Sequence, residues 1–163
     1  MTFTPIISEI HYNLSFEQGL DSEWEFIEIY NPHFITINIS GWAIADAVEV
    51  VFVDGLFIDP GRYIVIASDI GSYEGELPYD TQLFEFNEGF EINNNGATIR
   101  LLNSDGMEID IVEFTDYNEW PSEADGAGPS LEWRGMGFDN SLPNSWIPSN
   151  SFGGSQGAPN SLW

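Results

Sequence analysis

Hydrophobic residues in this chain occur in short runs, several of which alternate with polar residues, and this spacing restricts the fold more than any other feature. Helical periodicity is nearly absent, and Gly, Pro, Asn and Asp separate the runs. A period of two directs one face of a β-strand toward a core, whereas a helix needs apolar residues three or four positions apart. The pattern therefore predicts an all-β chain. The expected strands are Ile6–Tyr12, Glu25–Asn31, Ile35–Ile39, Trp42–Ala45, Glu49–Val53, Tyr63–Ala67, Thr98–Leu102, Met107–Phe114 and Leu131–Trp133.

Turn residues lie at the ends of these expected strands. Asp105-Gly106 stands between two apolar runs, where glycine supplies the positive φ that a tight hairpin requires. Asp59-Pro60-Gly61 similarly leads into an apolar run. The stretch Ser68–Ala97 is long for a connection, so we expect a short extended piece within it, at Leu83–Phe86. About nine strands joined in this way favour a single β-sandwich domain over residues 1–163.

The charge of the chain excludes some partners. It has 27 Asp and Glu residues against three Arg and no Lys, which gives a formal net charge of -24. Such a field repels polyphosphates and anionic surfaces, so neither nucleic acid nor a membrane is an expected partner. Because 42% of the residues are hydrophobic and 15% aromatic, the chain does not resemble an acidic disordered tail. We interpret most of the charge as a solvated acidic surface.

Cysteine usage and the first residues bear on the location of the protein. The chain has no cysteine, which excludes disulfides, thiol nucleophiles and thiolate metal sites. No apolar run approaches the roughly 18 residues of a membrane span. Met1–Thr4 leads directly into a strand-like run, without the features of a signal peptide. We expect either a cytoplasmic protein or one module of a longer exported chain.

The segment after Trp133 combines loop-forming residues with aromatic ones. Gly, Pro, Asn and Ser dominate it, but a disordered tail would not usually carry so many rings. We therefore expect residues 135–163 to form an ordered, irregular segment that wraps against the sandwich. Its rings would lie buried under a sheet edge, cover Phe26 and Tyr30, and leave Glu28 near the rim. The apolar residues of this segment include Phe138, Trp146, Ile147, Phe152 and Trp163.

Signatures of catalysis are absent from the sequence. His11 and His33 are the only imidazoles, and no motif such as Gly-x-Ser-x-Gly accompanies them. Their spacing matches no zinc signature, and there is no phosphate-binding loop. With 27 acidic residues, some pair of carboxylates must lie at a separation suited to glycoside hydrolysis. Such a pair is therefore weak evidence for glycosidase activity. We expect no enzymatic activity and no required cofactor.

Calcium is the metal that this chain would hold if it binds one. Ca²⁺ takes six to eight oxygen ligands, often from acidic loops next to flexible glycines. One candidate group precedes the second expected strand, and the other lies around the long hairpin. They consist of Asp21, Glu23 and Glu25, and of Asp110, Glu113 and Asp116. The alternative for both groups is a solvated surface.

Carbohydrate binding is a further alternative. Sugars stack on aromatic faces while nearby carboxylates accept hydrogen bonds from their hydroxyl groups. Phe26, Glu28 and Tyr30 alternate along one expected strand face, and Trp120 stands among acidic residues. These four residues are the candidate binding residues, and the competing interpretation is that the rings belong to the core.

The order of motifs resembles the lamin tail domain, most closely the bacterial extracellular form that ends in a glycine-rich loop and an Asn-Ser pair. The resemblance spans nearly the whole chain, although the family usually has Thr-Pro where this chain has Ser155-Gln156. The motifs are SEIHYN (8–13), EFIEIYNP (25–32), ISGWAIAD (39–46), PGRYIVIA (60–67), ATIRLLNSDG (97–106), IDIVEF (109–114), EWPSEADGAGPSLE (119–132) and GGSQGAPNS (153–161).

The resemblance implies an immunoglobulin-like β-sandwich without a catalytic centre, attached to a larger secreted or surface protein. Vertebrate relatives are described as binding partners and DNA, but this chain lacks the basic surface that DNA binding requires. We therefore expect an extracellular or cell-surface module of a multidomain chain that acts in adhesion, positioning or partner binding. Its partner would be a protein or a polysaccharide surface, and a calcium-assisted carbohydrate-binding module is the alternative.

Overall fold

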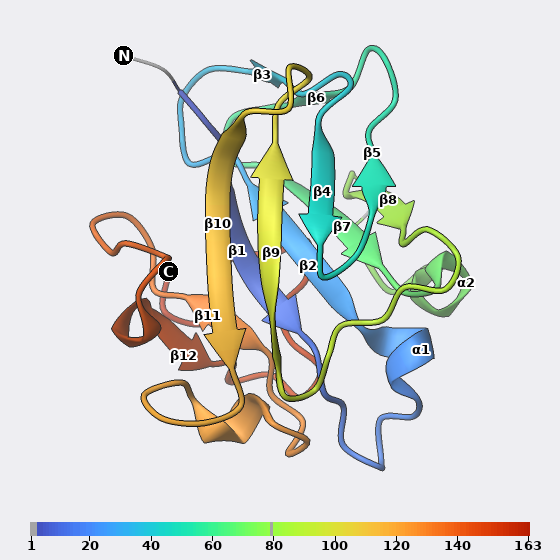
Figure 1. Ribbon diagram of the computed structural model, residues 1–163, viewed down its shortest axis with the longest axis vertical. Coiled ribbons are helices and arrows are strands. Elements are labelled where there is room, and N and C mark those ends of the chain that lie inside the picture. The colour runs from blue at the N-terminus through green and yellow to red at the C-terminus, as the bar shows by residue number, and fades with distance from the viewer. Residues whose placement is uncertain (1–2, 79) are drawn as a thin grey trace.

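Two β-sheets face each other across one hydrophobic core in the computed structural model, which describes residues 3–78 and 80–163 (Figure 1). The larger sheet has the strand order β12-β11-β1-β2-β7-β8, with bounds Trp146–Pro148, Leu131–Trp133, Ile6–His11, Phe26–Tyr30, Tyr63–Ala67 and Gln82–Glu85. The smaller sheet has the order β10-β9-β4-β5, with bounds Glu108–Thr115, Gly96–Leu102, Ala43–Asp46 and Val50–Val51. The strands β3 (Ile37–Asn38) and β6 (Phe57–Ile58) pair separately at one end of the sandwich.

The alternation of side chains explains how the larger sheet is covered on both faces. In β2, Ile27 and Ile29 point into the core between the sheets, and β7 does the same with Ile64 and Ile66. The intervening residues lie on the opposite, outer face of the larger sheet. That outer face is also buried, because two further parts of the chain cover it.

A pair of short helices covers the first part of the outer face. The helices are α1 (Asp21–Trp24) and α2 (Ile70–Tyr73). Tyr73 packs with Phe26, Val65 and Ala67 in a second apolar cluster that is separate from the main core. Two 3₁₀ turns, η1 (Ser122–Ala124) and η2 (Pro143–Ser145), lie later in the chain. None of the helices in the described ranges is long and apolar enough to cross a membrane.

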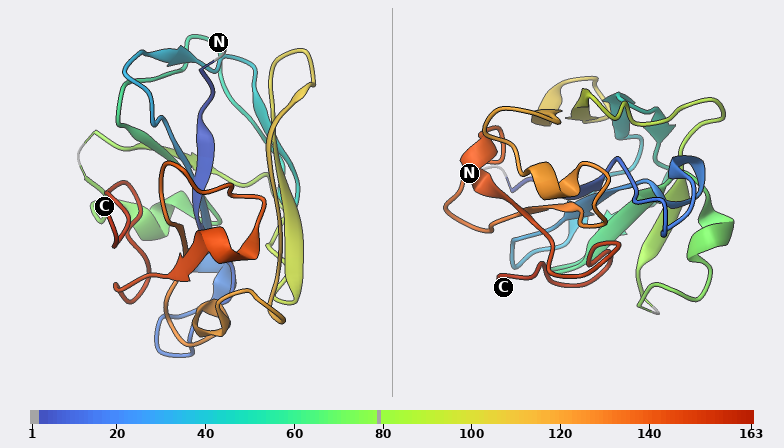
Figure 2. Two further views of the ribbon diagram at one scale, coloured as in Figure 1. Left: turned by 90° about the vertical axis from the view of Figure 1, so that its left-hand side faces the viewer. Right: turned by 90° about the horizontal axis from the view of Figure 1, so that it is seen from below.

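The C-terminal ribbon, residues 149–163, covers the second part of the outer face. It follows β12 and contains turns but no strand. Figure 2 shows it on the side of the larger sheet that faces away from the smaller sheet, so the molecule has three layers at this point. The last strand, β12, pairs with β11 at the edge of the larger sheet.

The sandwich predicted from the sequence is confirmed, whereas several local details differ. Two strands were not expected: β6 has only two residues, and β12 ends in Pro148, which a sheet edge tolerates. The prediction of buried rings in the C-terminal segment is right for Trp146, which is 3% exposed, and wrong for others. Phe152 is 60% and Trp163 42% exposed, because the ribbon binds the sheet mainly through its backbone amides, although Trp163 packs on Tyr30 as expected.

Candidate functional site

Three glutamates form a row across neighbouring strands on the outer face of the larger sheet. Glu132 of β11 pairs in register with Glu9 of β1, and Glu9 pairs with Glu28 of β2. All three residues are fully buried. Side chains directly opposite each other on antiparallel strands lie about 5 Å apart, so the three carboxyl groups share a small volume. We call Glu132, Glu9 and Glu28 the glutamate row.

Backbone amides of the C-terminal ribbon bind the glutamate row. Each carboxyl group accepts one of these N–H groups: Ser155 donates to Glu9 (2.7 Å), Gly157 to Glu28 (2.7 Å) and Ser161 to Glu132 (2.8 Å). Asn160 adds two hydrogen bonds from its side-chain amide, to the carbonyl oxygens of Ser8 (3.0 Å) and Trp133 (2.9 Å). The motif GGSQGAPNS therefore fastens the ribbon to the sheet.

The hydroxyl of Ser155 indicates that the glutamate row holds a proton. Ser155 Oγ lies 3.0 Å from Glu9 Oε2 and 2.7 Å from Glu132 Oε1. A hydroxyl carries one proton and can donate to only one of these oxygens. The other contact is a hydrogen bond only if that carboxyl group is protonated and donates to Ser155 Oγ. Burial raises the pKa of Glu9 to about 8, although donors from Ser130 and Ser155 oppose the shift, so we assign the proton to Glu9.

The expectation that Glu28 lies near a rim is wrong. Glu28 is fully buried, and its carboxyl group accepts hydrogen bonds from Ser8 Oγ (2.6 Å) and from the Gly157 amide. Burial, and then the charge of Glu9, raise the pKa of Glu28 well above its ordinary value. Because the ribbon lies across the middle of the outer face, a residue in the middle of β2 is covered rather than exposed.

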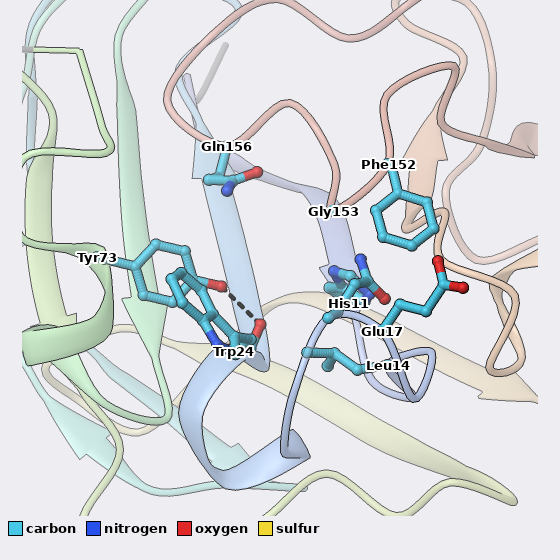
Figure 3. A pocket seen from close by; sticks show the side chains of 9 residues that line it. His11, Leu14, Glu17, Trp24, Tyr73, Phe152, Gly153 and Gln156 are labelled. Carbon is cyan, nitrogen blue, oxygen red and sulfur yellow. Dashed lines mark hydrogen bonds between the residues drawn. The ribbon is translucent and has the colours of Figure 1, made fainter.

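A pocket opens beside the glutamate row, between the helices and the C-terminal ribbon. Its volume is about 340 Å³. Figure 3 shows Trp24 of α1 and Tyr73 of α2 on one side, Phe152 of the ribbon on the opposite side, and His11 between them. The Tyr73 hydroxyl donates to the Trp24 carbonyl oxygen (2.6 Å), which joins the two helices at this wall. We call this space the α1–α2 pocket.

His11 contributes no charge to the α1–α2 pocket. It is 1% exposed, and neither of its ring nitrogens has a hydrogen bond of good geometry, although the Gly153 carbonyl lies near the ring. Burial lowers the pKa of His11 to about 4, with the Gly153 carbonyl and the charge of Asp21 acting in the opposite direction. The ring is therefore neutral at ordinary pH.

The loop between β1 and α1 lines the pocket and also carries two exposed apolar side chains. Leu14, Glu17 and Gln18 line it from the loop between β1 and α1. Phe16 of the same loop is 100% exposed, and Leu20 is 63% exposed. Exposed apolar side chains on a loop that lines a concave site are typical of surfaces that bind a partner.

The four candidate binding residues lie in different places. Phe26 is fully buried under α2, and Glu28 lies under the C-terminal ribbon. Tyr30 is partly exposed and stacks on Tyr63, with ring centroids 4.8 Å apart, and Trp163 also packs on it at 4.8 Å. Trp120 is 8% exposed and packs against Phe114 and Trp146. The structure therefore does not bring the four together into one exposed surface.

The first candidate calcium group divides between separate hydrogen-bond networks. Asp21 accepts hydrogen bonds from Leu14 N (3.0 Å) and from the Asn94 side chain (2.8 Å). Glu23 is exposed, whereas Glu25 is buried and accepts from Ile92 N (3.0 Å). Burial raises the pKa of Glu25 to about 8.

The second candidate calcium group lies along β10 and after it. Asp110 and Glu113 are three residues apart, which directs their side chains to opposite faces of the strand. Asp110 accepts from Ile7 N (2.7 Å) and from Asn140 (2.8 Å), Glu113 is exposed, and Asp116 is half-buried beyond the strand. Within residues 3–78 and 80–163, no three acidic or histidine side chains form a group suited to a metal ion.

Sequence reasoning missed most residues of both sites. Glu9 and Glu132 each interrupt an apolar strand in the same way as Glu28, and this shared pattern was the available signal. The rings of Trp24 and Tyr73 gave no such signal, because each belongs to a helix of four residues, too short for helical periodicity.

The excess of acidic side chains leads to a prediction about salt. Among the described residues, ion pairs join Arg62 to Asp80 and Arg100 to Asp46 and Glu108, which leaves most carboxylates without a cation. Their repulsion is stronger in the folded state than in the expanded chain, so screening favours folding. We expect the melting temperature to rise by several degrees when NaCl is raised to about 0.5 M. A melting temperature that falls with salt would contradict this.

The comparisons with known proteins agree with this fold. The family model described as Lamin Tail Domain matches residues 4–116, more than half of the chain, from β1 to the end of β10. The curated proteins contain no match. The lamin tail domain is an immunoglobulin-like domain family that is generally non-catalytic. On the basis of this match and the sandwich described above, the chain belongs to the lamin tail domain family.

Proposed function

We propose that this lamin tail domain is a non-catalytic binding module that attaches a larger, extracellular or cell-surface protein to a protein partner through the α1–α2 pocket. The observation that carries the proposal is the pocket itself, which is lined by two segments that each carry an exposed aromatic ring. Phe16 lies on one segment and Phe152 on the other, and they are 100% and 60% exposed. Aromatic anchors of this kind dominate the free energy of binding at protein interfaces.

The buried carboxyl groups support a structural role rather than a catalytic one. A general acid or base must reach the substrate. Each carboxyl group of the glutamate row instead accepts an amide of the protein's own C-terminal ribbon. The module thus uses these acids to hold the wall of the pocket that carries Phe152.

Site-specific photo-crosslinking tests the proposed partner site. We would replace Phe16 by a benzophenone-bearing phenylalanine and illuminate the protein with the extracellular fraction of the cells that make it. Phe57 is the matched control, because it is also an exposed phenylalanine, at 48%, but lies on β6. The expected result is a defined protein adduct from position 16 only. Equal products from positions 16 and 57, or none from position 16, would overturn the proposed site.

A polysaccharide partner is the second candidate, because the pocket combines the partly exposed ring of Trp24 with the carboxylate of Glu17. Sugar rings stack on aromatic faces, and carboxylates accept their hydroxyl hydrogens. A panel of soluble polysaccharides, with and without calcium, would change the intrinsic fluorescence if Trp24 binds sugar. Unchanged fluorescence across the panel would exclude this candidate.

A further inference from the structure

The walls of the α1–α2 pocket are aromatic, and its charge is negative. Trp24 and Tyr73 lie with their centroids 5.2 Å apart in an edge-to-face arrangement, and Phe152 faces them (Figure 3). Glu17 is the charged side chain in the lining, and His11 is neutral at ordinary pH. Aromatic faces are negative in the centre, so they attract a cation that approaches them.

The protein's own cations lie elsewhere. Arg62 pairs with Asp80, and Arg100 pairs with Asp46 and Glu108. The Arg134 guanidinium lies 4.3 Å from the centre of the Phe138 ring. Within the described part of the chain no arginine lines the pocket, and the chain carries a net charge of -24. A partner that approaches this pocket therefore enters a strongly negative field, which favours a cationic group.

We propose that the α1–α2 pocket binds the alkylammonium group of a lysine side chain from the partner protein, with the partly exposed ring of Trp24 and the exposed ring of Phe152 against the stem and Glu17 near the charge. This inference rests on the proposed function and specifies its chemistry. A lysine stem is apolar and covers ring surface while its terminal charge stays near water and the carboxylate. An anionic or phosphorylated side chain would meet repulsion in the same place.

A titration of the whole chain with blocked amino acids tests the inference. The probe is Nα-acetyl-lysine methylamide, and the comparison compound is Nα-acetyl-norleucine methylamide, which keeps the stem and lacks the ammonium group. The readout is the indole N–H signal of Trp24 in ¹H–¹⁵N spectra, identified with the Trp24→Phe variant. We expect saturable shifts with the lysine probe at an affinity about ten-fold higher than with norleucine.

Paired variants separate local from diffuse electrostatics. Glu17→Gln and Glu113→Gln each remove one negative charge from an exposed residue, but only Glu17 lines the pocket. Glu17→Gln should weaken the lysine probe about three-fold, and Glu113→Gln should leave its affinity unchanged. Melting temperatures would verify that both variants are folded.

Several outcomes would overturn the inference. If the norleucine compound binds as tightly as the lysine probe, the pocket recognises only the apolar stem. If Glu17→Gln and Glu113→Gln weaken the lysine probe equally, the attraction comes from the net charge of the whole protein and not from Glu17. Tighter binding of tetramethylammonium than of the lysine probe would assign the pocket to a small free cation instead. If the Phe16 adduct persists in any of these cases, the partner site stands and only its lysine chemistry fails. If neither the Phe16 adduct nor the Trp24 shifts are observed, both the proposed partner site and its lysine chemistry are refuted.

Discussion

The free energy of unfolding should fall as the pH rises from about 5 to 8. Burial raises the pKa of Glu9 and of Glu25 to about 8, from an ordinary 4.5, and raises that of Glu28 as well. In this range the folded state keeps protons that the unfolded state has already lost, so a rise in pH favours unfolding. Each such proton contributes about 1.4 kcal/mol per pH unit until the folded pKa is passed.

His11 acts in the opposite direction at lower pH. Burial lowers its pKa from 6.5 to about 4, so the unfolded state binds a proton that the folded state does not. This contribution to stability is lost as the pH falls through that range. Above pH 4.5 the three raised carboxyl groups outweigh this one imidazole, so the stability maximum should lie at about pH 4 to 4.5, and denaturant unfolding at several pH values measures it. A free energy of unfolding that is flat or rises between about pH 5 and 8 would contradict the assignment.

The Glu9→Gln variant tests the proton on Glu9 directly. A glutamine amide can accept from Ser130 and the Ser155 amide and can donate to Ser155 Oγ, as the protonated carboxyl group does. The variant should match the wild type near pH 4.5, and its advantage in stability should grow by about 1.4 kcal/mol per pH unit from there to about pH 8. Glu113→Gln, a control at an exposed residue, should leave the pH dependence of the free energy of unfolding as it is in the wild type. A Glu9→Gln variant that is less stable than the wild type at pH 9 would refute the assignment of a proton to Glu9.

Substitution of Gly154 by alanine should destabilise the protein by about 3 kcal/mol or more. Gly154 has φ +93°, and an added Cβ would lie 2.5 Å from Glu9 Oε1 and 3.0 Å from Phe26 Cζ. The ribbon would have to move away from the sheet, which would break its amide hydrogen bonds to the glutamate row. Denaturant unfolding gives the size of the loss.

Gly55→Ala is the matched control for Gly154→Ala. Gly55 has φ +79°, but an added Cβ would meet no atom within 4 Å. Gly55→Ala should lower the free energy of unfolding by about 1 kcal/mol, the cost of a positive φ at a residue with a Cβ. The difference between the two variants then measures the packing of the ribbon on the sheet. Equal losses would show that the contact of Gly154 with the outer face contributes little.

The sequence predicted the architecture well and the candidate sites poorly, for a physical reason. Strands such as Tyr63–Ala67 follow from local alternation and turn chemistry, which are properties of neighbouring residues. The glutamate row depends on the register of β11, β1 and β2, whose residues are far apart in the chain. A single Glu in each strand looks like a solvent-facing residue until a third layer covers it. The pocket likewise depends on how the loop, helices and ribbon meet.

The C-terminal ribbon over the outer face also affects where this domain can be truncated. The match to the family ends at residue 116, yet β11 and β12 complete the larger sheet and the ribbon covers its outer face. A fragment trimmed to that border would lose Leu131 and Trp133 from its main core and uncover two glutamates that have no water-facing role in the intact protein. In recombinant or chimeric proteins, the smallest transferable unit therefore extends through Ser161, the last residue that bonds to the glutamate row.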